Sequence, residues 1–262
     1  EAHSCALAAS GEVYCWGQNN YGQLGDGSTT PRISPVRVAG LPAGIEQVWS
    51  SVNHTCARTQ AGELWCWGYN GYGQLGDGSY TNRLQPVRVT GIGAVSSVSA
   101  GAMHTCATTT AGDIYCWGYG GYGQLGNGSG GSSAVPQLTS GSLGFATEVS
   151  AGQYHTCARY SNGRAACWGY NGWGQLGSNN TSYLYTPQLL PSPASGIESV
   201  TAGLYHSCLR TSSGAGQCFG ANYYGQIGNS AVSIAYSPVT VTGYETGGLS
   251  QIVTGSSSLV TC

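Results

Sequence analysis

The sequence predicts an all-β fold, a β-propeller of four-stranded antiparallel blades with about 50 residues per repeat, five full repeats and a partial one. Two regularities support this prediction. A stretch that is clearest at residues 66–76 occurs five times, and the five histidines of the chain stand 51, 50, 51 and 51 residues apart. A period near 50 is too long for a simple helical hairpin and fits four short strands, the size of one propeller blade.

Strand positions can be assigned in the second repeat. We expect its four strands at residues 45–50, 54–59, 63–67 and 86–89, and no segment has a convincing helical periodicity. The second and third strands are joined by a short turn that contains Gly62, as a β-hairpin requires. A Trp-Gly pair ends the third strand in four repeats, and we expect these large rings to pack between blades.

A proline lies twenty residues after the second cysteine of each repeat. Because proline cannot donate a hydrogen bond to a sheet, we expect it at the first residue of the outermost, edge strand. The prolines are Pro35, Pro86, Pro136, Pro187 and Pro238.

Ten of the eleven cysteines form five pairs with a constant separation of ten residues. In the second repeat the pair is symmetric about Ala61, so the two cysteines face each other across the hairpin at a distance that a disulfide spans. The CxxC spacing of common metal sites is absent, and five regular disulfides favour an oxidising compartment, hence a secreted or cell-surface protein. The predicted pairs are Cys5–Cys15, Cys56–Cys66, Cys106–Cys116, Cys157–Cys167 and Cys208–Cys218.

The two ends of the chain are incomplete repeats. The first repeat begins at His3 and lacks its first strand, whereas residues 249–262 supply a first strand and the start of a second. If the ring closes within this chain, the C-terminal strand completes the N-terminal blade, although Cys262 would then compete with the strand that carries Cys5. Cys262 is the odd cysteine, and we expect it to be unpaired or bonded to another chain. Since the chain begins at Glu1, we expect a processed product or part of something longer.

We expect one domain over residues 1–262. Its repeats fall at approximately 1–44, 45–94, 95–145, 146–196 and 197–247, with a partial repeat at 248–262.

Charged residues make up only 7% of the chain, and its net charge is −2. Without a basic run we expect no nucleic-acid partner, and without an apolar run of about 18 residues we expect no membrane insertion. A protein partner, self-assembly or a carbohydrate remain as candidate partners.

No catalytic set, cofactor site or metal site is predicted. The histidines precede structural cysteines in every repeat, so hydrogen bonding within the blade is favoured over metal ligation. Asp26 and Asp77 lie in Gly-Asp-Gly-Ser turns that are compatible with calcium, but Asn127, Ser178 and Asn229 take the equivalent places, so turn chemistry is the better interpretation. We therefore expect that the protein is not an enzyme.

Aromatic residues in the loops are the best candidate binding surface, because aromatic faces beside amide groups suit a sugar or a protein. One set belongs to the repeat, and packing is the stronger interpretation for it: Tyr21, Tyr72, Tyr122, Trp173 and Tyr224. A second set departs from the repeat and is freer to serve a partner: Tyr80, Tyr183, Tyr185, Tyr223 and Tyr236.

The repeat resembles that of the regulator of chromosome condensation (RCC1) family. A Gly-x-x-His-[Ser/Thr] strand is followed by Trp-Gly-x-Asn-x-Tyr-Gly-Gln-Leu-Gly, at residues 101–105 with 117–126 and at 152–156 with 168–177. The resemblance covers essentially all 262 residues and implies a β-propeller, usually of seven blades. The best-known relative is a nucleotide exchange factor for a small GTPase, but its partner-binding residues lie outside the repeat motif. The cysteine pairs resemble those of secreted bacterial members, whose propellers serve as binding surfaces.

These observations lead to a functional prediction. We expect a non-enzymatic secreted or cell-surface binding or assembly module that uses its propeller loops for protein contact. Two alternatives are a structural subunit of an extracellular filament or surface layer, and a carbohydrate-binding lectin.

Overall fold

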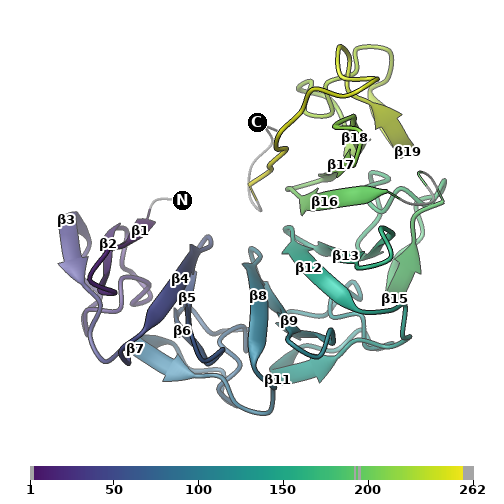
Figure 1. Cartoon of the computed structure of the whole chain (residues 1–262). Helices are drawn as coiled ribbons and strands as arrows, with labels where there is room; N and C mark the ends of the chain where they lie inside the picture. Colours follow the sequence, from purple (N-terminus) through teal and green to yellow (C-terminus); the bar gives the residue numbers. More distant parts are fainter. Residues whose placement is uncertain (1–2, 192, 194–195, 256–262) are drawn as a thin grey trace.

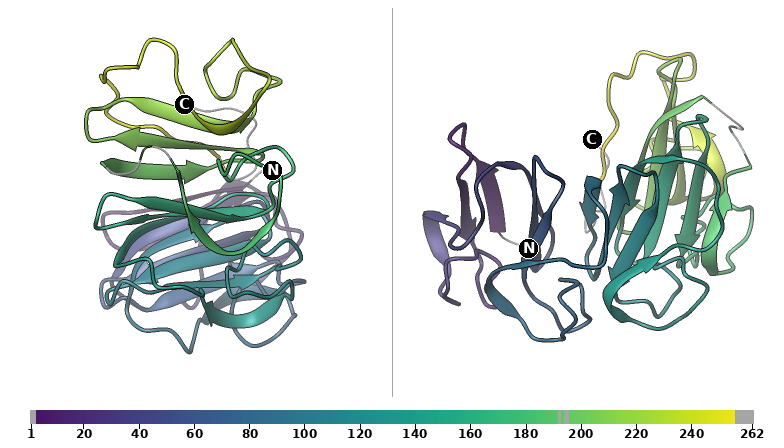
Figure 2. Two further views of the ribbon diagram at one scale, coloured as in Figure 1. Left: turned by 90° about the vertical axis from the view of Figure 1, so that its right-hand side faces the viewer. Right: turned by 60° about the horizontal axis from the view of Figure 1, so that its bottom comes forward.

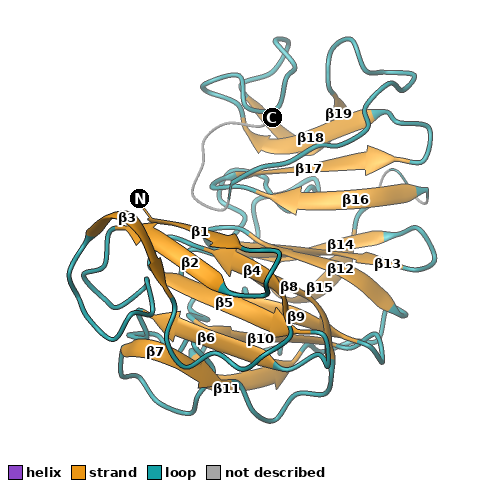
Figure 3. Cartoon of the chain, turned by 60° about the vertical axis from the view of Figure 1, so that its left-hand side comes forward, coloured by secondary structure: helices purple, strands orange, loops and turns teal. Residues whose placement is uncertain are grey.

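In the computed structural model, which describes residues 3–191, 193 and 196–255, five antiparallel sheets follow one another around an arc (Figure 1). Each sheet is one blade, and the described residues form strands without any helix (Figure 3). Seen from the side, the blades form successive layers (Figure 2). Blade 1 has three strands and the other four blades have four each, which confirms the all-β blade architecture.

Within each blade, the strands lie in chain order from the inner side of the arc to its outer side. Blade 1 contains β1 (His3–Leu7), β2 (Val13–Gly17) and β3 (Arg32–Arg37). Blade 2 contains β4 (Ile45–Ser50), β5 (His54–Thr59), β6 (Leu64–Gly68) and β7 (Arg83–Arg88). Blade 3 contains β8 (Val95–Ala100), β9 (His104–Thr109), β10 (Ile114–Gly118) and β11 (Ser133–Leu138). Blade 4 contains β12 (Ala146–Ala151), β13 (His155–Tyr160), β14 (Ala165–Gly169) and β15 (Leu184–Leu189). Blade 5 contains β16 (Ile197–Ala202), β17 (His206–Thr211), β18 (Gly216–Ala221) and β19 (Ile234–Thr240).

The outer strands differ from the prediction. β7 begins at Arg83, three residues before Pro86, which was expected to be its first residue. The pairing shifts in this strand, because Cys66 is opposite Val87 whereas Gly68 is opposite Arg83. Pro86 therefore lies in an irregular part of an edge strand, where its missing N–H breaks no regular ladder.

The five hairpins have the predicted register. Cys56 lies opposite Cys66, and the two Cα atoms of each bridged pair are 4.1 Å apart. The structure confirms all five predicted disulfides, and each one links two strands of the same blade. The bridges therefore stiffen single blades and do not connect one blade to another.

Tryptophan side chains pack between blades, as predicted. Trp67 of blade 2 is fully buried against Leu24 and Val38 of blade 1. Its indole N–H also donates a hydrogen bond of 2.9 Å to the backbone oxygen of Gln23 in blade 1. Trp117 and Trp168 repeat this arrangement, and Phe219 fills the same position in blade 5 without the N–H.

The histidines join neighbouring blades, whereas the prediction placed their hydrogen bonds within one blade. Thr105 of blade 3 donates its hydroxyl proton to the backbone oxygen of Gln74 in blade 2. His54 of blade 2 therefore donates from Nε2 to the Thr105 hydroxyl, over 2.9 Å. His3, His104 and His155 make the equivalent contacts with Thr55, Thr156 and Ser207.

The arc is open, and its two ends do not meet (Figure 1). As predicted, blade 1 lacks its first strand. A first strand was expected within 249–262. In the described part of this segment, residues 249–255, the structure has only an isolated bridge at Thr254, and this segment belongs to none of the five sheets. Cys262 lies outside the described residues. Within residues 3–191, 193 and 196–255 there is no helix long and apolar enough to cross a bilayer.

Candidate functional site

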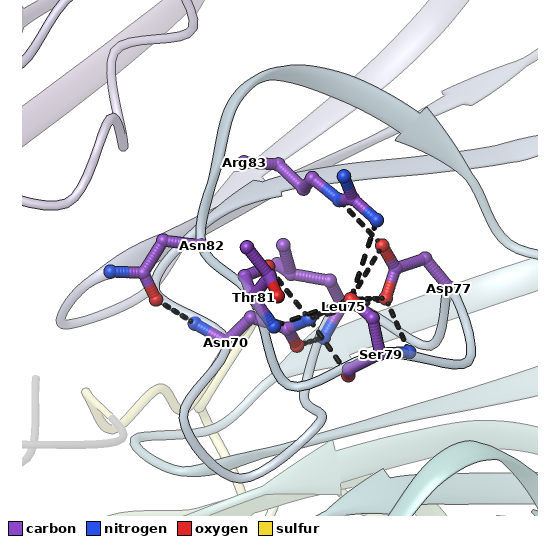
Figure 4. A network of polar contacts seen from close by, with 7 residues as sticks. All are labelled: Asn70, Leu75, Asp77, Ser79, Thr81, Asn82 and Arg83. Atoms are coloured by element: carbon purple, nitrogen blue, oxygen red, sulfur yellow. Dashed lines mark hydrogen bonds and ion pairs between the residues drawn. The ribbon is translucent and has the colours of Figure 1, made fainter.

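The loop that follows the third strand is held by an asparagine in blades 1, 2, 4 and 5. In blade 2, Asn70 accepts a hydrogen bond from the Leu75 N–H and donates to the backbone oxygens of Ser79 and Thr81 (Figure 4). Asn70 is fully buried, so its amide replaces the hydrogen bonds that the loop backbone would otherwise lack. Gly120 takes this place in blade 3, where an added Cβ would collide with the Gly131 oxygen.

Asp77 serves the same loop, as the turn interpretation predicted. Its carboxylate accepts hydrogen bonds from Ser79 and from Arg83 Nε, the latter at 2.6 Å (Figure 4). Burial would raise the pKa of Asp77, but the hydrogen bonds from Ser79 and Arg83 outweigh it and lower the pKa below its ordinary value. In blade 1, Asp26 and Arg32 repeat the pair. The carboxylates thus neutralise arginines, and in the described residues no three His, Cys, Asp or Glu side chains are grouped to hold a metal.

The aromatic residue of the repeated loop is fixed through its backbone. The Gln74 side chain accepts a hydrogen bond of 3.0 Å from the Tyr72 N–H. The same glutamine contact orients Tyr21, Tyr122, Trp173 and Tyr224. These rings are therefore presented at the same end of successive blades, which we call the loop end.

Tyrosine rings form a continuous ladder across the loop end of blades 1 to 4. It begins with Tyr21 and Tyr69, whose ring centroids are 4.8 Å apart, and continues through ring contacts at 5.1 to 6.1 Å. Tyr122 lies at its centre and contacts four other tyrosines. The members of this ladder, which we call the aromatic band, are Tyr21, Tyr69, Tyr72, Tyr119, Tyr122, Tyr154, Tyr170 and Tyr183.

A smaller cluster continues toward blade 5. Trp173 contacts Tyr205 at 6.2 Å and Tyr223 at 5.6 Å. Four other predicted candidates are exposed but make none of these ring contacts: Tyr80, Tyr185, Tyr224 and Tyr236. Two of them, Tyr185 and Tyr236, lie where the outer strand of one blade packs on Gly123 or Gly174 of the preceding blade.

Five aromatic residues of these clusters were missed from the sequence. Tyr69, Tyr119 and Tyr170 directly follow the Trp-Gly pair, and Tyr154 and Tyr205 directly precede a histidine. The hairpin register places both positions at the same end of the blade, because His54 is opposite Gly68. Their repetition beside the assigned strands was therefore a usable signal.

Four tyrosine hydroxyls of the band remain protonated at neutral pH. Burial, reinforced by neighbouring tyrosines, raises the pKa of Tyr69, Tyr119, Tyr154 and Tyr170 above the ordinary value of 10. The band therefore offers aromatic surface together with neutral groups that donate and accept hydrogen bonds.

Charge is distributed unequally between the two ends of the blades. At the loop end of blades 3 to 5, residues 119–132, 152–154, 170–183, 203–205 and 222–233 contain no Asp, Glu, Lys or Arg. The opposite, hairpin end carries charged residues that form ion pairs, such as Arg37 with Glu12 and Arg88 with Glu63. The aromatic surface of blades 3 to 5 is consequently uncharged.

The remaining polar groups are poor candidates for catalysis. Burial lowers the pKa of His54, His104 and His155 to about 3, so these histidines are neutral and enclosed between blades. The concave inner side of the arc contains a cavity of about 370 Å³ lined by Ser50, Ser99 and Ser150, among others. Ser99 and Ser150 accept hydrogen bonds from backbone N–H groups of the next blade. His3 also lines the cavity, but its Nε2 is hydrogen-bonded to the Thr55 hydroxyl over 2.8 Å.

Repeated four-stranded blades that are joined around a common axis define the class of β-propeller repeat proteins. Four segments of the chain, residues 10–58, 61–108, 111–159 and 162–209, match the regulator of chromosome condensation (RCC1) repeat. The chain belongs to this family.

Comparison with individual proteins agrees with the family. The chain is 34% identical over 233 residues to the Arabidopsis thaliana ultraviolet-B receptor UVR8, which covers 87% of the chain and 53% of the receptor. It therefore spans about half the length of this curated relative. Human WBSCR16 has a similar structure, with a TM-score of 0.85, 23% identity and coverage of 97% of this chain and 68% of WBSCR16. Yeast RCC1 (Prp20) bound to Kap60 is also similar, with a TM-score of 0.85, 19% identity and coverage of 98% of this chain and 63% of the yeast chain. At these identities the likeness to the two solved structures shows only a shared fold.

Proposed function

We propose that the chain is a non-enzymatic binding module that contacts a protein partner through the loop end of its blades. The observation that carries this proposal is the aromatic band, whose part on blades 3 and 4 lies on an uncharged surface. Tyrosine and tryptophan are enriched at protein interfaces because they bury much area with few rotatable bonds. A related propeller, yeast RCC1, has been crystallised bound to another protein, Kap60, which supports binding as the role of the fold.

The absence of charge from the loop end of blades 3 to 5 limits the kind of partner surface that fits. A charged group that docks on this surface would lose water without gaining an opposite charge, which is unfavourable. We therefore expect the partner surface to be uncharged where it meets the aromatic residues of blades 3 to 5. Binding should then change little between about 0.05 and 0.5 M salt, because no exposed charge pair is screened.

The experiment compares the wild-type chain with a Tyr122→Ala, Tyr183→Ala double variant and a control variant, Glu63→Ala with Arg88→Ala, at the hairpin end. Each is immobilised and exposed to cell-surface and extracellular proteins of the source organism, and cross-linking locates the contact. A protein partner cross-linked to the loops of blades 3 to 5, retained by the control and lost by the tyrosine variant, is the expected result. Identical captured proteins for all three chains would refute the proposal.

A secreted or cell-surface location is part of this proposal. The five disulfides are compatible with an oxidising compartment, where such bonds persist.

Carbohydrate binding is the second candidate, favoured by the same uncharged aromatic rings and their neutral hydroxyl groups. It predicts retention on a neutral glycan array and competition by the free sugar. A structural role in an extracellular filament or surface layer is a third candidate. It would require contacts between copies at the ends of the arc.

A further inference from the structure

Two tyrosines of the aromatic band meet at the two ends of the same loop in blade 4. Tyr170 directly follows β14, and Tyr183 directly precedes β15. Their ring centroids are 4.9 Å apart, and the ring planes are inclined by 45°. Among the ring pairs of the described residues, only Tyr21 and Tyr69, at 4.8 Å, are closer.

Hydrogen bonds hold the backbone next to each of these two rings. The side chain of Asn171, which follows Tyr170, is fully buried and donates to the Asn180 backbone oxygen over 2.8 Å. The Asn180 side chain in turn accepts a hydrogen bond of 2.9 Å from the N–H of Ser182, which precedes Tyr183. A short chain of hydrogen bonds therefore connects the two ends of the loop and holds the rings side by side.

The hydroxyl end of Tyr170 has a defined position. Its ring lies across Gly172, where an added Cβ would collide with the Tyr170 hydroxyl oxygen and the ring carbon that carries it. Burial first, and then the nearby Tyr183 hydroxyl, raise the pKa of Tyr170. The hydroxyl ends of the two rings therefore lie near each other, and so do the ring carbons next to each hydroxyl.

The fold does not require a tyrosine at the position of Tyr183, directly before the outer strand. In blade 2 the equivalent residue, Asn82, accepts a hydrogen bond from the Asn70 N–H through its side chain. In blade 3 the equivalent residue, Ser132, accepts one from the Gly120 N–H. Blade 4 has a ring there instead, so a close tyrosine pair at the ends of one loop is a property of this blade and not of the repeat.

We propose that Tyr170 and Tyr183 are a site of oxidative modification, at which a peroxidase couples the two rings into a dityrosine. Each phenol loses one electron and its hydroxyl proton, and the two radicals form a carbon–carbon bond between the ring carbons next to the hydroxyls. The hydrogens of those two carbons then move to the oxygens, which restores both hydroxyl groups. Two hydrogen atoms leave the protein in total, and they reduce one hydrogen peroxide to two water molecules.

Neighbouring rings of the aromatic band can pass a radical to this pair. Tyr122 contacts both members, at 5.1 Å from Tyr170 and 5.5 Å from Tyr183. A ring that is oxidised elsewhere in the band can take an electron from its neighbour, so the radical moves through ring contacts until coupling consumes it. The new bond closes the loop of residues 170–183 and needs no partner at the loop end. This proposal and the proposed function can therefore fail separately.

Treatment of the whole chain with a haem peroxidase and a limiting amount of hydrogen peroxide tests the proposal. The protein is kept dilute with its disulfides intact, and the monomer is isolated by size exclusion. We expect dityrosine fluorescence in the monomer, a mass lower by two hydrogen atoms, and cross-linked peptides that contain Tyr170 and Tyr183. Tyr170→Phe and Tyr183→Phe keep the ring but have no phenol to oxidise at that position, so each should lose this product.

Two control variants test whether the coupling is selective. Tyr80→Phe removes an exposed tyrosine outside the ring contacts of the band, and Tyr69→Phe removes a member of the other close pair. Both should leave the yield of the Tyr170–Tyr183 product unchanged. Cross-links that map mainly to other tyrosine pairs, a monomer product of equal yield in Tyr183→Phe, or coupling only between chains would overturn the proposal. A monomer that never loses two hydrogen atoms would overturn it as well.

Discussion

The junction between blades 2 and 3 and the junction between blades 4 and 5 are built alike from different side chains. The first uses Thr105 and Trp117, and the second uses Ser207 and Phe219. Ser207 still donates to the backbone oxygen of Gln175 at 2.8 Å, and Phe219 is still fully buried. The structure thus requires a hydroxyl group and a flat ring at each junction, whereas the threonine methyl and the indole N–H are dispensable.

Acid should break both junctions alike and have the largest effect. Burial lowers the pKa of His54, His104 and His155 to about 3 in the folded chain, whereas unfolded histidine titrates near 6.5. Stability is therefore independent of these groups above about pH 6.5 and falls as pH decreases toward 3, because the unfolded chain binds the protons. Denaturant titrations with the disulfides intact should show that the free energy of unfolding falls by on the order of several kcal/mol between pH 7 and pH 4. A His104→Gln variant should show a shallower decrease, and a flat profile in the wild type would contradict the assignment.

Removal of the tryptophan ring should destabilise the protein more at a junction between two blades than in blade 1, where Trp16 is partly exposed. Trp117→Ala should lower the free energy of unfolding by about 3–5 kcal/mol, as expected for a buried aromatic residue. Trp16→Ala, at the same repeat position but partly exposed, should cost at most about 1 kcal/mol in the monomer. Urea denaturation at low protein concentration measures both. Equal losses would show that Trp16 is as buried as Trp117.

The hydroxyl group can be tested with a natural substitution. Thr105→Ala should cost about 2 kcal/mol, because His54 Nε2–H would lose its acceptor in a buried site. Thr105→Ser should cost less than about 1 kcal/mol, since Ser207 serves the equivalent junction. If both variants were equally destabilised, the methyl group rather than the hydroxyl would be the important part.

Loss of the hydrogen bond from the indole N–H should have the smallest effect on the free energy of unfolding. Trp168→Phe removes its hydrogen bond to the Gln124 oxygen, which keeps its other donor, Thr156. We expect a loss of about 1 kcal/mol, the usual net value of one hydrogen bond. The reverse substitution, Phe219→Trp, serves as the matched test in blade 5. A loss above about 3 kcal/mol for Trp168→Phe would indicate a packing defect instead.

Local relations in the sequence predicted the fold well. The Cys56–Cys66 pairing followed from a fixed separation around one turn, and the bounds of β4 and β5 followed from short alternating segments next to it. The outer strand was less predictable, because proline signals an edge but does not show whether a bulge lets the strand continue past it. The start of β7 before Pro86 depends on such a shift in pairing.

Contacts between repeats were harder to predict. His54 bonds to Thr105, which is 51 residues away, and nothing in one repeat specifies that neighbour. The sequence analysis named the band members that the repeated loop supplies, Tyr21, Tyr72 and Tyr122, and also Tyr183, which departs from the repeat. Tyr154 was missed because it lies on a different loop, and only the arrangement of the blades brings the two loops together.

The common ring and hydroxyl of the junctions also bear on how such a protein can change over time. Because each blade meets the next through the same parts, a blade is a unit that fits either neighbour. Insertion or loss of coding sequence for one 50-residue repeat would therefore preserve the kind of interface between blades, and with it the curvature, and would alter only the span of the arc.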